Sequence, residues 1–249
     1  MTPRGQAKGT PADAPRPPPR ALVCVHGAGG GGWEWRIWQR VAAARGLEVF
    51  APDLRPADAG LAATRFADYR AQVQDWCAQA ASRGPFALAG ASLGGLLALA
   101  VAAAAKPAAL LLVNPLPPAG IAGMPPQAPR PPLVPWGRRR SIDGTRRAMP
   151  EADAAACLYA FRRWRDESGR VLDEAAAGVA VEAPACPLRV LAGGADADVP
   201  PAVASAIGER YGGSVRLLEG AGHLGPLLGR GAAAVAADAL DWMLHAHDP

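Results

Sequence analysis

The sequence Ala87-Leu88-Ala89-Gly90-Ala91-Ser92-Leu93-Gly94-Gly95-Leu96-Leu97-Ala98-Leu99-Ala100 joins a short apolar run to an Ala- and Leu-rich stretch through the pattern G-x-S-x-G. It predicts a strand, a very tight turn and a helix, with Ser92 at the apex. Side chains two residues before and after the apex would collide with the strand or helix, so glycine suits positions 90 and 94. The turn would expose the Ser92 hydroxyl and place the N–H of Leu93 at a helix N-terminus, where it can face an oxyanion. A Gly-Ser turn without a catalytic role is the alternative.

The composition favours one domain and excludes several classes of protein. Half of the 249 residues are apolar, which is enough for one sizeable core with an insertion. Residues 1–20 are rich in Pro, Ala, Gly and Arg and predict a disordered leader. We expect neither a signal peptide nor a membrane-spanning segment, because no apolar run is long enough. The four scattered cysteines favour reduced thiols in a cytoplasmic protein. The net charge of +4 comes with no recognisable nucleic-acid module, so we expect no nucleic-acid partner.

Apolar, β-prone runs alternate with helical patterns along most of the chain. Besides the strand before Ser92, strands are predicted at 21–25, 47–51, 109–113, 187–192 and 214–218. Helices are predicted at 35–45, 67–82, 151–166, 202–211 and 231–245. This alternation predicts a parallel sheet covered on both faces by helices. It breaks at the proline-rich stretch that starts at Leu116, so we expect a cap insertion at 116–183 between two core segments, 21–115 and 184–249.

Four polar motifs follow predicted strands, and ligands bind at the carboxyl ends of the strands in an open parallel sheet. They are the glycine loop that begins with His26-Gly27, then Ser92, Asp196 and His223. The glycine loop lacks the Lys-Ser or Lys-Thr pair and the following acidic residue that nucleotide binding requires. We therefore expect it to approach a different ligand, with His26 ordering the loop rather than taking part in catalysis.

With these motifs the chain resembles the α/β-hydrolase fold superfamily, in its branch of serine esterases, lipases and thioesterases. The matching patterns are H-G-x-G at 26–29, G-x-S-x-G-G at 90–95, G-x-x-D-x-x-V-P at 193–200 and G-x-G-H at 220–223. The resemblance covers the chain from Ala21 to its end except for the insertion. It implies an α/β-hydrolase fold with helices on both faces and a cap. The residues before the first strand are proline-rich, so we expect about six mostly parallel strands without the usual antiparallel start.

The resemblance implies that Ser92 is the nucleophile, His223 the general base and then acid, and Asp196 the carboxylate that orients His223. The other histidines are His26 in the glycine loop and two in the terminal tail, which also leaves His223 as the base. Asp198 and Asp53 are alternative acids, and the spacing to Val199-Pro200 favours Asp196. The oxyanion hole would consist of the N–H groups of Leu93 and Ala28, with Gly29 as the less favoured second donor.

The expected reaction is transfer of an acyl group to water, from a small-molecule ester or thioester, with no metal or organic cofactor. An apolar pocket under the cap is expected to involve Trp33, Trp136 and Trp164, although tryptophans of this kind commonly belong to a core. Arginines concentrate in the insertion, where they are either a solvated face or contacts for an anionic group of the substrate. They are Arg138, Arg139, Arg140, Arg146, Arg147, Arg162, Arg163 and Arg165.

Two other classes of function remain open at this point. The same three residues could support carbon–carbon bond hydrolysis, lactone hydrolysis, lyase chemistry or acyl transfer in a biosynthetic pathway, because a fold does not fix the reaction. A ligand-binding receptor with negligible turnover is the second alternative. The sequence predicts neither the substrate nor the oligomeric state.

Overall fold

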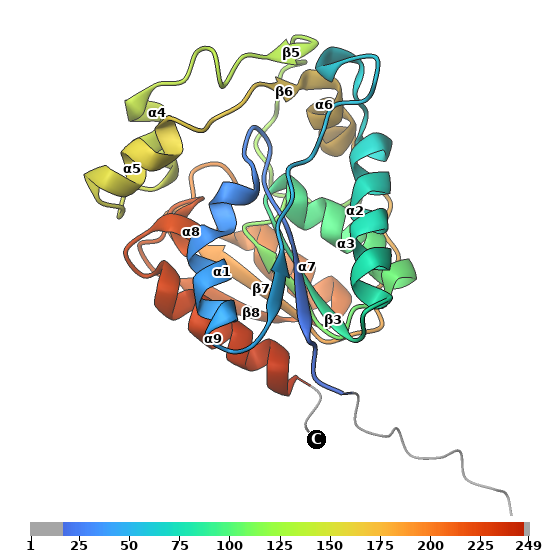
Figure 1. Ribbon diagram of the computed structural model, residues 1–249. Helices are drawn as coiled ribbons and strands as arrows, with labels where there is room; N and C mark the ends of the chain where they lie inside the picture. Colours follow the sequence, from blue (N-terminus) through green and yellow to red (C-terminus); the bar gives the residue numbers. More distant parts are fainter. Residues whose placement is uncertain (1–16, 247–249) are drawn as a thin grey trace, which may run out of the picture.

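A computed structural model describes residues 17–246 of the chain (Figure 1). The leader expected at 1–20 therefore lies largely outside the described residues. Six strands form one sheet in the order β2-β1-β3-β4-β7-β8, and every neighbouring pair is parallel. The strands are β1 Ala21–Val25, β2 Glu48–Phe50, β3 Phe86–Ala91, β4 Leu110–Val113, β7 Leu188–Gly193 and β8 Ser214–Leu218. The predicted α/β-hydrolase fold with about six parallel strands is confirmed.

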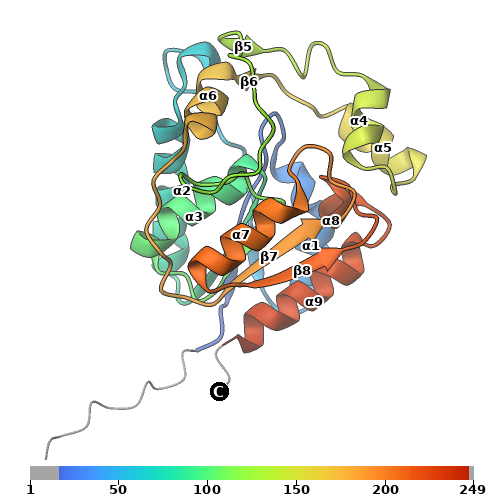
Figure 2. The ribbon, with the colours of Figure 1, turned by 180° about the vertical axis from the view of Figure 1, so that it is seen from behind.

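Helices cover both faces of this sheet because its central strands are apolar on both sides. One face carries α2 Phe66–Ala81, α3 Leu93–Ala105 and α7 Pro201–Tyr211, and the other carries α1 Arg36–Ala43, α8 Gly225–Leu228 and α9 Ala232–His245. Figures 1 and 2 show these layers from opposite sides. Every residue of β1, β3 and β4 is buried, as expected for strands between two helical layers. No helix among residues 17–246 is both long and apolar enough to cross a membrane.

The segment 116–183, called the cap segment below, lies beyond the carboxyl ends of the strands (Figure 1). It contains a small antiparallel pair, β5 Leu133–Val134 with β6 Glu167–Ser168, and the helices α4 Ile142–Ala148, α5 Ala154–Phe161 and α6 Gly169–Ala177. The helix predicted at 151–166 is shorter than expected, because Asp153 caps it and the chain leaves the helix after Phe161. Helix α6 packs into the main core through Val171 and Ala175.

The register of the sheet brings the ends of β1 and β3 together. Val25, the last residue of β1, lies opposite Gly90, two residues before Ser92. The glycine loop after β1 and the turn after β3 are therefore neighbours. Strand β4 lies between β3 and β7, and β8 lies beside β7. Because these strands are parallel, the loops that contain Asp196 and His223 lie at the same edge of the sheet as Ser92.

Candidate active site

Ser92 occupies a backbone conformation that a residue with a side chain rarely adopts. Its φ is 53° and its ψ is −120°, and helix α3 begins at the next residue. A Cβ at Gly90 would lie 2.2 Å from the carbonyl oxygen of Gly94, and a Cβ at Gly94 would lie 2.3 Å from that of Val25. Both positions therefore require glycine, for the reason the sequence pattern suggested.

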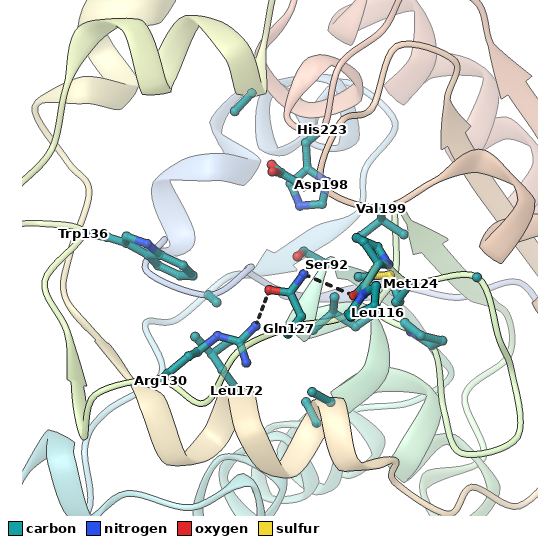
Figure 3. A pocket seen from close by; sticks show the side chains of 18 of the residues that line it. Ser92, Leu116, Met124, Gln127, Arg130, Trp136, Leu172, Asp198, Val199 and His223 are labelled. Atoms are coloured by element: carbon teal, nitrogen blue, oxygen red, sulfur yellow. Dashed lines mark hydrogen bonds between the residues drawn. The ribbon is translucent and has the colours of Figure 1, made fainter.

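His223 and Asp196 form a hydrogen-bonded pair at the ends of β8 and β7. His223 Nδ1 lies 2.7 Å from Asp196 Oδ2, and the Asp196 side chain is fully buried. Asp196 Oδ1 accepts hydrogen bonds from the N–H groups of Asp198, at 2.8 Å, and Val199, at 3.0 Å. With Nδ1 held by Asp196, the Nε2 side of the imidazole points toward Ser92 (Figure 3).

The surroundings of His223 favour its protonated form. Burial alone would lower its pKa, but the hydrogen bond and charge of Asp196, with smaller effects of Asp198 and Glu34, hold the pKa of His223 above the ordinary 6.5. Asp198 has an exposed side chain and lies close to the pair without replacing Asp196. Ligand atoms of Asp196, Asp198 and His223 lie within 4.8 Å of one another, but hydrogen bonds already occupy those of Asp196 and His223 Nδ1, so the cluster does not suit a metal ion.

Asn114 connects the two loops that carry this pair. It is buried at the end of β4, with a φ of 44°. Its Nδ2 donates to the backbone oxygen of His223 at 2.7 Å, and its Oδ1 accepts from the N–H of Gly193 at 2.7 Å. The sequence predicted no role for Asn114. Its place directly after a buried strand was the signal for this supporting role.

The glycine loop lies against Ser92 and leaves the N–H group of Ala28 without an acceptor among the described residues. A Cβ at Gly27 would lie 3.2 Å from Ser92 Cβ. The N–H of Gly27 donates to Glu34 Oε2 at 2.9 Å, and that of Gly29 donates to Glu167 Oε2 at 2.8 Å. Within residues 17–246, the N–H groups of Ala28 and Leu93 donate to no protein acceptor. The predicted pair of oxyanion donors is thus unoccupied, whereas the Gly29 N–H is engaged.

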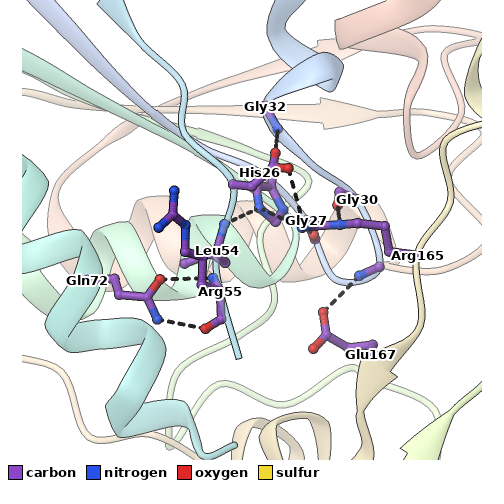
Figure 4. A network of polar contacts seen from close by, with 11 residues as sticks. His26, Gly27, Gly30, Gly32, Leu54, Arg55, Gln72, Arg165 and Glu167 are labelled. Carbon is purple, nitrogen blue, oxygen red and sulfur yellow. Dashed lines mark hydrogen bonds and ion pairs between the residues drawn. The ribbon is translucent and has the colours of Figure 1, made fainter. Parts of the chain in front are cut away.

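His26 and Arg165 brace this loop (Figure 4). His26 Nε2 accepts from the N–H of Leu54 at 2.8 Å, so the Nδ1–H donates to the backbone oxygen of Gly27, also at 2.8 Å. Burial lowers the pKa of His26 to about 4, which keeps the ring neutral. From the cap segment, Arg165 donates its backbone N–H to Gly29 and its Nε to the backbone oxygen of Gly30, at 2.7 and 2.5 Å. His26 thus has the loop-ordering contacts that the sequence suggested.

Two buried glutamates behind the loop were missed in the sequence. Glu34 is 1% exposed; its Oε2 holds Gly27, and its Oε1 has no partner among the described residues. Burial raises the pKa of Glu34 to about 7, against the opposing effects of the Gly27 hydrogen bond and of the His223 and Arg165 charges. Glu167 joins the core to the cap segment, because its Oε1 accepts from Tyr69 Oη at 2.8 Å while its Oε2 holds Gly29. In the sequence Glu34 lies between Trp33 and Trp35, which is an unusual place for a charged residue. That position could have indicated that Glu34 is buried.

A cavity of about 910 Å³ opens above Ser92 between the core and the cap segment (Figure 3). Ser92, His223 and Ala28 lie at its base. Trp136 and Trp164 line it, as expected for pocket residues. Trp33 is not among the lining residues; it packs edge-on against Trp164 and Tyr159, with centroid distances of 5.8 and 5.9 Å. Trp33 therefore belongs to the aromatic cluster behind the wall, and Trp164 separates it from the cavity.

A model of the alpha/beta hydrolase family matches residues 22–238, and the chain belongs to this family. The fold is similar to that of a metagenome-derived lipolytic enzyme, at 19% identity and TM-score 0.67, covering 92% of this chain and 95% of the other. The structure of tomato methylketone synthase I complexed with 2-tridecanone matches at 14% identity and TM-score 0.71, covering 92% of this chain and 99% of the other. A methylesterase from Arabidopsis matches at 16% identity and TM-score 0.69, covering 91% of this chain and 98% of the other. Comparison with curated proteins gave no match.

Proposed function

We propose that this protein is a serine hydrolase that cleaves a carboxylic ester or thioester of a small-molecule substrate through an acyl-enzyme on Ser92. One observation carries the proposal. A serine in a strained turn shares a cavity with a histidine whose Nδ1 lies 2.7 Å from a buried carboxylate. A serine hydroxyl needs such a base, and the base needs an orienting partner on its other nitrogen.

The steps follow from these positions. His223 Nε2 takes the proton of Ser92 as Oγ attacks the carbonyl carbon, and the leaving alcohol or thiol then receives that proton as its bond to carbon breaks. Water attacks the resulting acyl-enzyme, gives a proton to His223, and releases the acid while Ser92 regains its proton. Asp196 accepts the Nδ1–H throughout and stabilises the imidazolium.

The oxyanion that forms in both steps would be held by the N–H groups of Ala28 and Leu93. Both donors are free of protein acceptors, and the Leu93 N–H belongs to the first turn of α3, where the helix dipole favours negative charge. Donors fixed in this way need no rearrangement as charge develops, which is the main source of their effect.

The cavity is large enough for a substrate with an extended apolar part. One wall is made by Leu116, Met124 and Leu172, from the start of the cap segment and from α6. An apolar acyl or alkyl chain would be buried there, while its carbonyl reaches Ser92.

A fluorophosphonate probe combined with p-nitrophenyl esters of increasing acyl length tests the proposal. We expect covalent labelling and ester turnover in the wild type and neither in Ser92→Ala. Ser205→Ala, on the exposed side of α7, is the matched control and should retain both. Absence of both labelling and turnover in folded wild-type protein would contradict the proposal and favour a binding protein.

A different reaction on the same residues is the second candidate. The fold is also similar to that of a methylketone synthase. Because one fold can carry different reactions, this similarity supports a reaction other than ester hydrolysis as the second candidate. Labelling of Ser92 without turnover of any ester or thioester would support this candidate over ester hydrolysis.

A further inference from the structure

The arginines of the cap segment fall into two groups. Those of the first group are engaged outside the cavity: Arg138 pairs with Asp166 at 2.5 Å, Arg163 lies 3.7 Å from the centroid of the Tyr159 ring, and Arg165 braces the glycine loop. The second group lines the cavity that contains Ser92, and consists of Arg130, Arg139, Arg140 and Arg147. The sequence alone could not separate the two groups.

The second group contains charges that no carboxylate balances. Arg130 pairs with Asp173 at 3.0 Å. Within residues 17–246, Arg139 and Arg147 have no side-chain hydrogen bond or ion pair. Arg140 donates to the backbone oxygen of Gly137 and lies 5.4 Å from the centroid of the Phe161 ring, but it pairs with no carboxylate. The only acidic residue among those that line the cavity is Asp198, next to His223. The cavity lining thus contains three guanidinium groups without a carboxylate partner and one carboxylate.

Helix α4 leaves room for a ligand beside these arginines. Its cavity side carries Ser141, Gly144, Thr145 and Ala148, which are all small and recur at the spacing of one helical face. Thr145 Oγ1 accepts from Trp164 Nε1 at 3.0 Å, which fixes an aromatic wall next to this face. The opposite wall of the cavity carries apolar side chains together with Arg130, whose charge is balanced by Asp173 of α6. The cavity-lining cations that have no carboxylate partner are Arg139, Arg140 and Arg147.

We infer that Arg139, Arg140 and Arg147 form an anion subsite, and that the substrate carries a carboxylate or phosphate group away from the bond cleaved at Ser92. The inference rests on the proposed hydrolase function and specifies its substrate class. Arg139, Arg140 and Arg147 are exposed residues that also line the cavity. Guanidinium groups bind both anions through charge-assisted hydrogen bonds. Because the three arginines belong to the cap segment, the anion would lie at the cap end of the substrate and the carbonyl at the sheet end.

Paired substrates that differ only in charge test the subsite. For the carboxylate, mono-p-nitrophenyl adipate is compared with its neutral methyl ester; for the phosphate, an acyl phosphopantetheine thioester is compared with the neutral acyl pantetheine. We expect kcat/KM to favour the anionic member of at least one pair by about 10-fold or more, less so at high salt. The pair with the larger ratio identifies the anion.

The triple variant Arg139→Ala/Arg140→Ala/Arg147→Ala should lower this ratio toward one. Arg162→Ala, an exposed cap arginine outside the cavity, is the matched control and should leave the ratio unchanged. Ser92-dependent turnover with equal rates for both members of both pairs would overturn the anion subsite alone and leave the hydrolase proposal intact. Calorimetric binding of the same compounds to Ser92→Ala needs no turnover; equal affinities there would overturn the subsite even for a protein that cleaves no ester.

Discussion

The two sides of the cavity are built by different means. On the sheet side, Ser92 and Asp196 follow the buried strands β3 and β7, and His223 follows the edge strand β8. Backbone groups or buried carboxylates hold the surrounding loops. On the cap side, Trp136 is 42% exposed, Arg139 and Arg140 lie on an irregular segment, and Arg147 lies in the short helix α4. Under the proposed function, the sheet side would fix where a bond is attacked, and the cap segment would select what is bound.

Removing the charge of Asp196 should have the largest effect, because it acts on the rigid side. Asp196→Asn is expected to lower kcat by about 10⁴-fold, since an amide can donate to Nδ1 and then favours the wrong tautomer of His223. Steady-state kinetics with a p-nitrophenyl ester measures the effect.

Asp198→Asn is the matched control for this variant. Asp198 raises the pKa of His223 only through its charge, so kcat should stay within a few-fold. Wild-type kcat/KM should rise with pH through a midpoint above 6.5, because His223 must be neutral to act as a base, and Asp198→Asn should move that midpoint to lower pH. A larger loss in Asp198→Asn than in Asp196→Asn would assign the acid to Asp198.

A methyl group at Gly94 should break the tight junction between β1 and the turn at Ser92. Its Cβ would lie 2.3 Å from the Val25 oxygen and 2.4 Å from the His26 oxygen, and neither backbone group can move without disturbing the sheet. Gly94→Ala is expected to lower the free energy of unfolding by about 3 kcal/mol or more, measured by urea denaturation. At Gly231 a Cβ meets nothing within 4 Å, so Gly231→Ala should cost less than about 1 kcal/mol. Equal stability of the two variants would contradict this packing.

Glu34 should make the stability of the sheet side depend on pH. The pKa of Glu34 is about 7 in the folded protein, and its ordinary value is 4.5. Between pH 4.5 and 7, therefore, Glu34 is ionised in the unfolded chain but keeps its proton in the folded protein. The contribution of Glu34 to stability is complete below pH 4.5 and falls by about 3 kcal/mol as the pH rises through 7. Glu34→Gln cannot titrate, so its unfolding free energy relative to wild type should increase over that range, measured in urea at pH 4.5 and 8.

Glu209→Gln on α7 is the matched control for the substitution, because it exchanges the same groups at an exposed position, without the burial that raises the pKa of Glu34. Parallel pH curves for Glu34→Gln and wild type would mean that the buried carboxyl titrates normally.

The sheet side was also the predictable side. Short apolar strands, each followed by a polar motif, predicted the sheet, its parallel direction and the convergence of Ser92, Asp196 and His223, because the carboxyl ends of parallel strands meet at one edge. The cap segment offered no such rule. Helix α4 was not expected, because its seven residues include Gly144 and only two apolar side chains. Helix α6 was not expected, because its inward face appears only once it packs on α2 and α3.

Residues that act through long-range contacts could not be found in the sequence. Glu167 reaches Gly29 and Tyr69, which lie 138 and 98 residues away, and nothing in its neighbourhood indicates burial. Trp33 was expected in the pocket because it follows the glycine loop. It packs instead against Tyr159 of α5 and against Trp164, behind the wall of the cavity. Proximity in sequence to a catalytic motif therefore does not establish access to the cavity.

The smallest predicted effect concerns the contact that joins the two sides. Tyr69 Oη donates to Glu167 Oε1 at 2.8 Å in a buried position, so Tyr69→Phe should lower the free energy of unfolding by about 1 to 2 kcal/mol and loosen the Gly29 end of the loop slightly. Tyr211 is the matched control, because its buried hydroxyl has no partner among the described residues, and Tyr211→Phe should cost nothing or stabilise. Urea denaturation of both variants measures the difference. A Tyr69→Phe variant as stable as Tyr211→Phe would mean that Glu167 holds the cap segment to the glycine loop without help from α2.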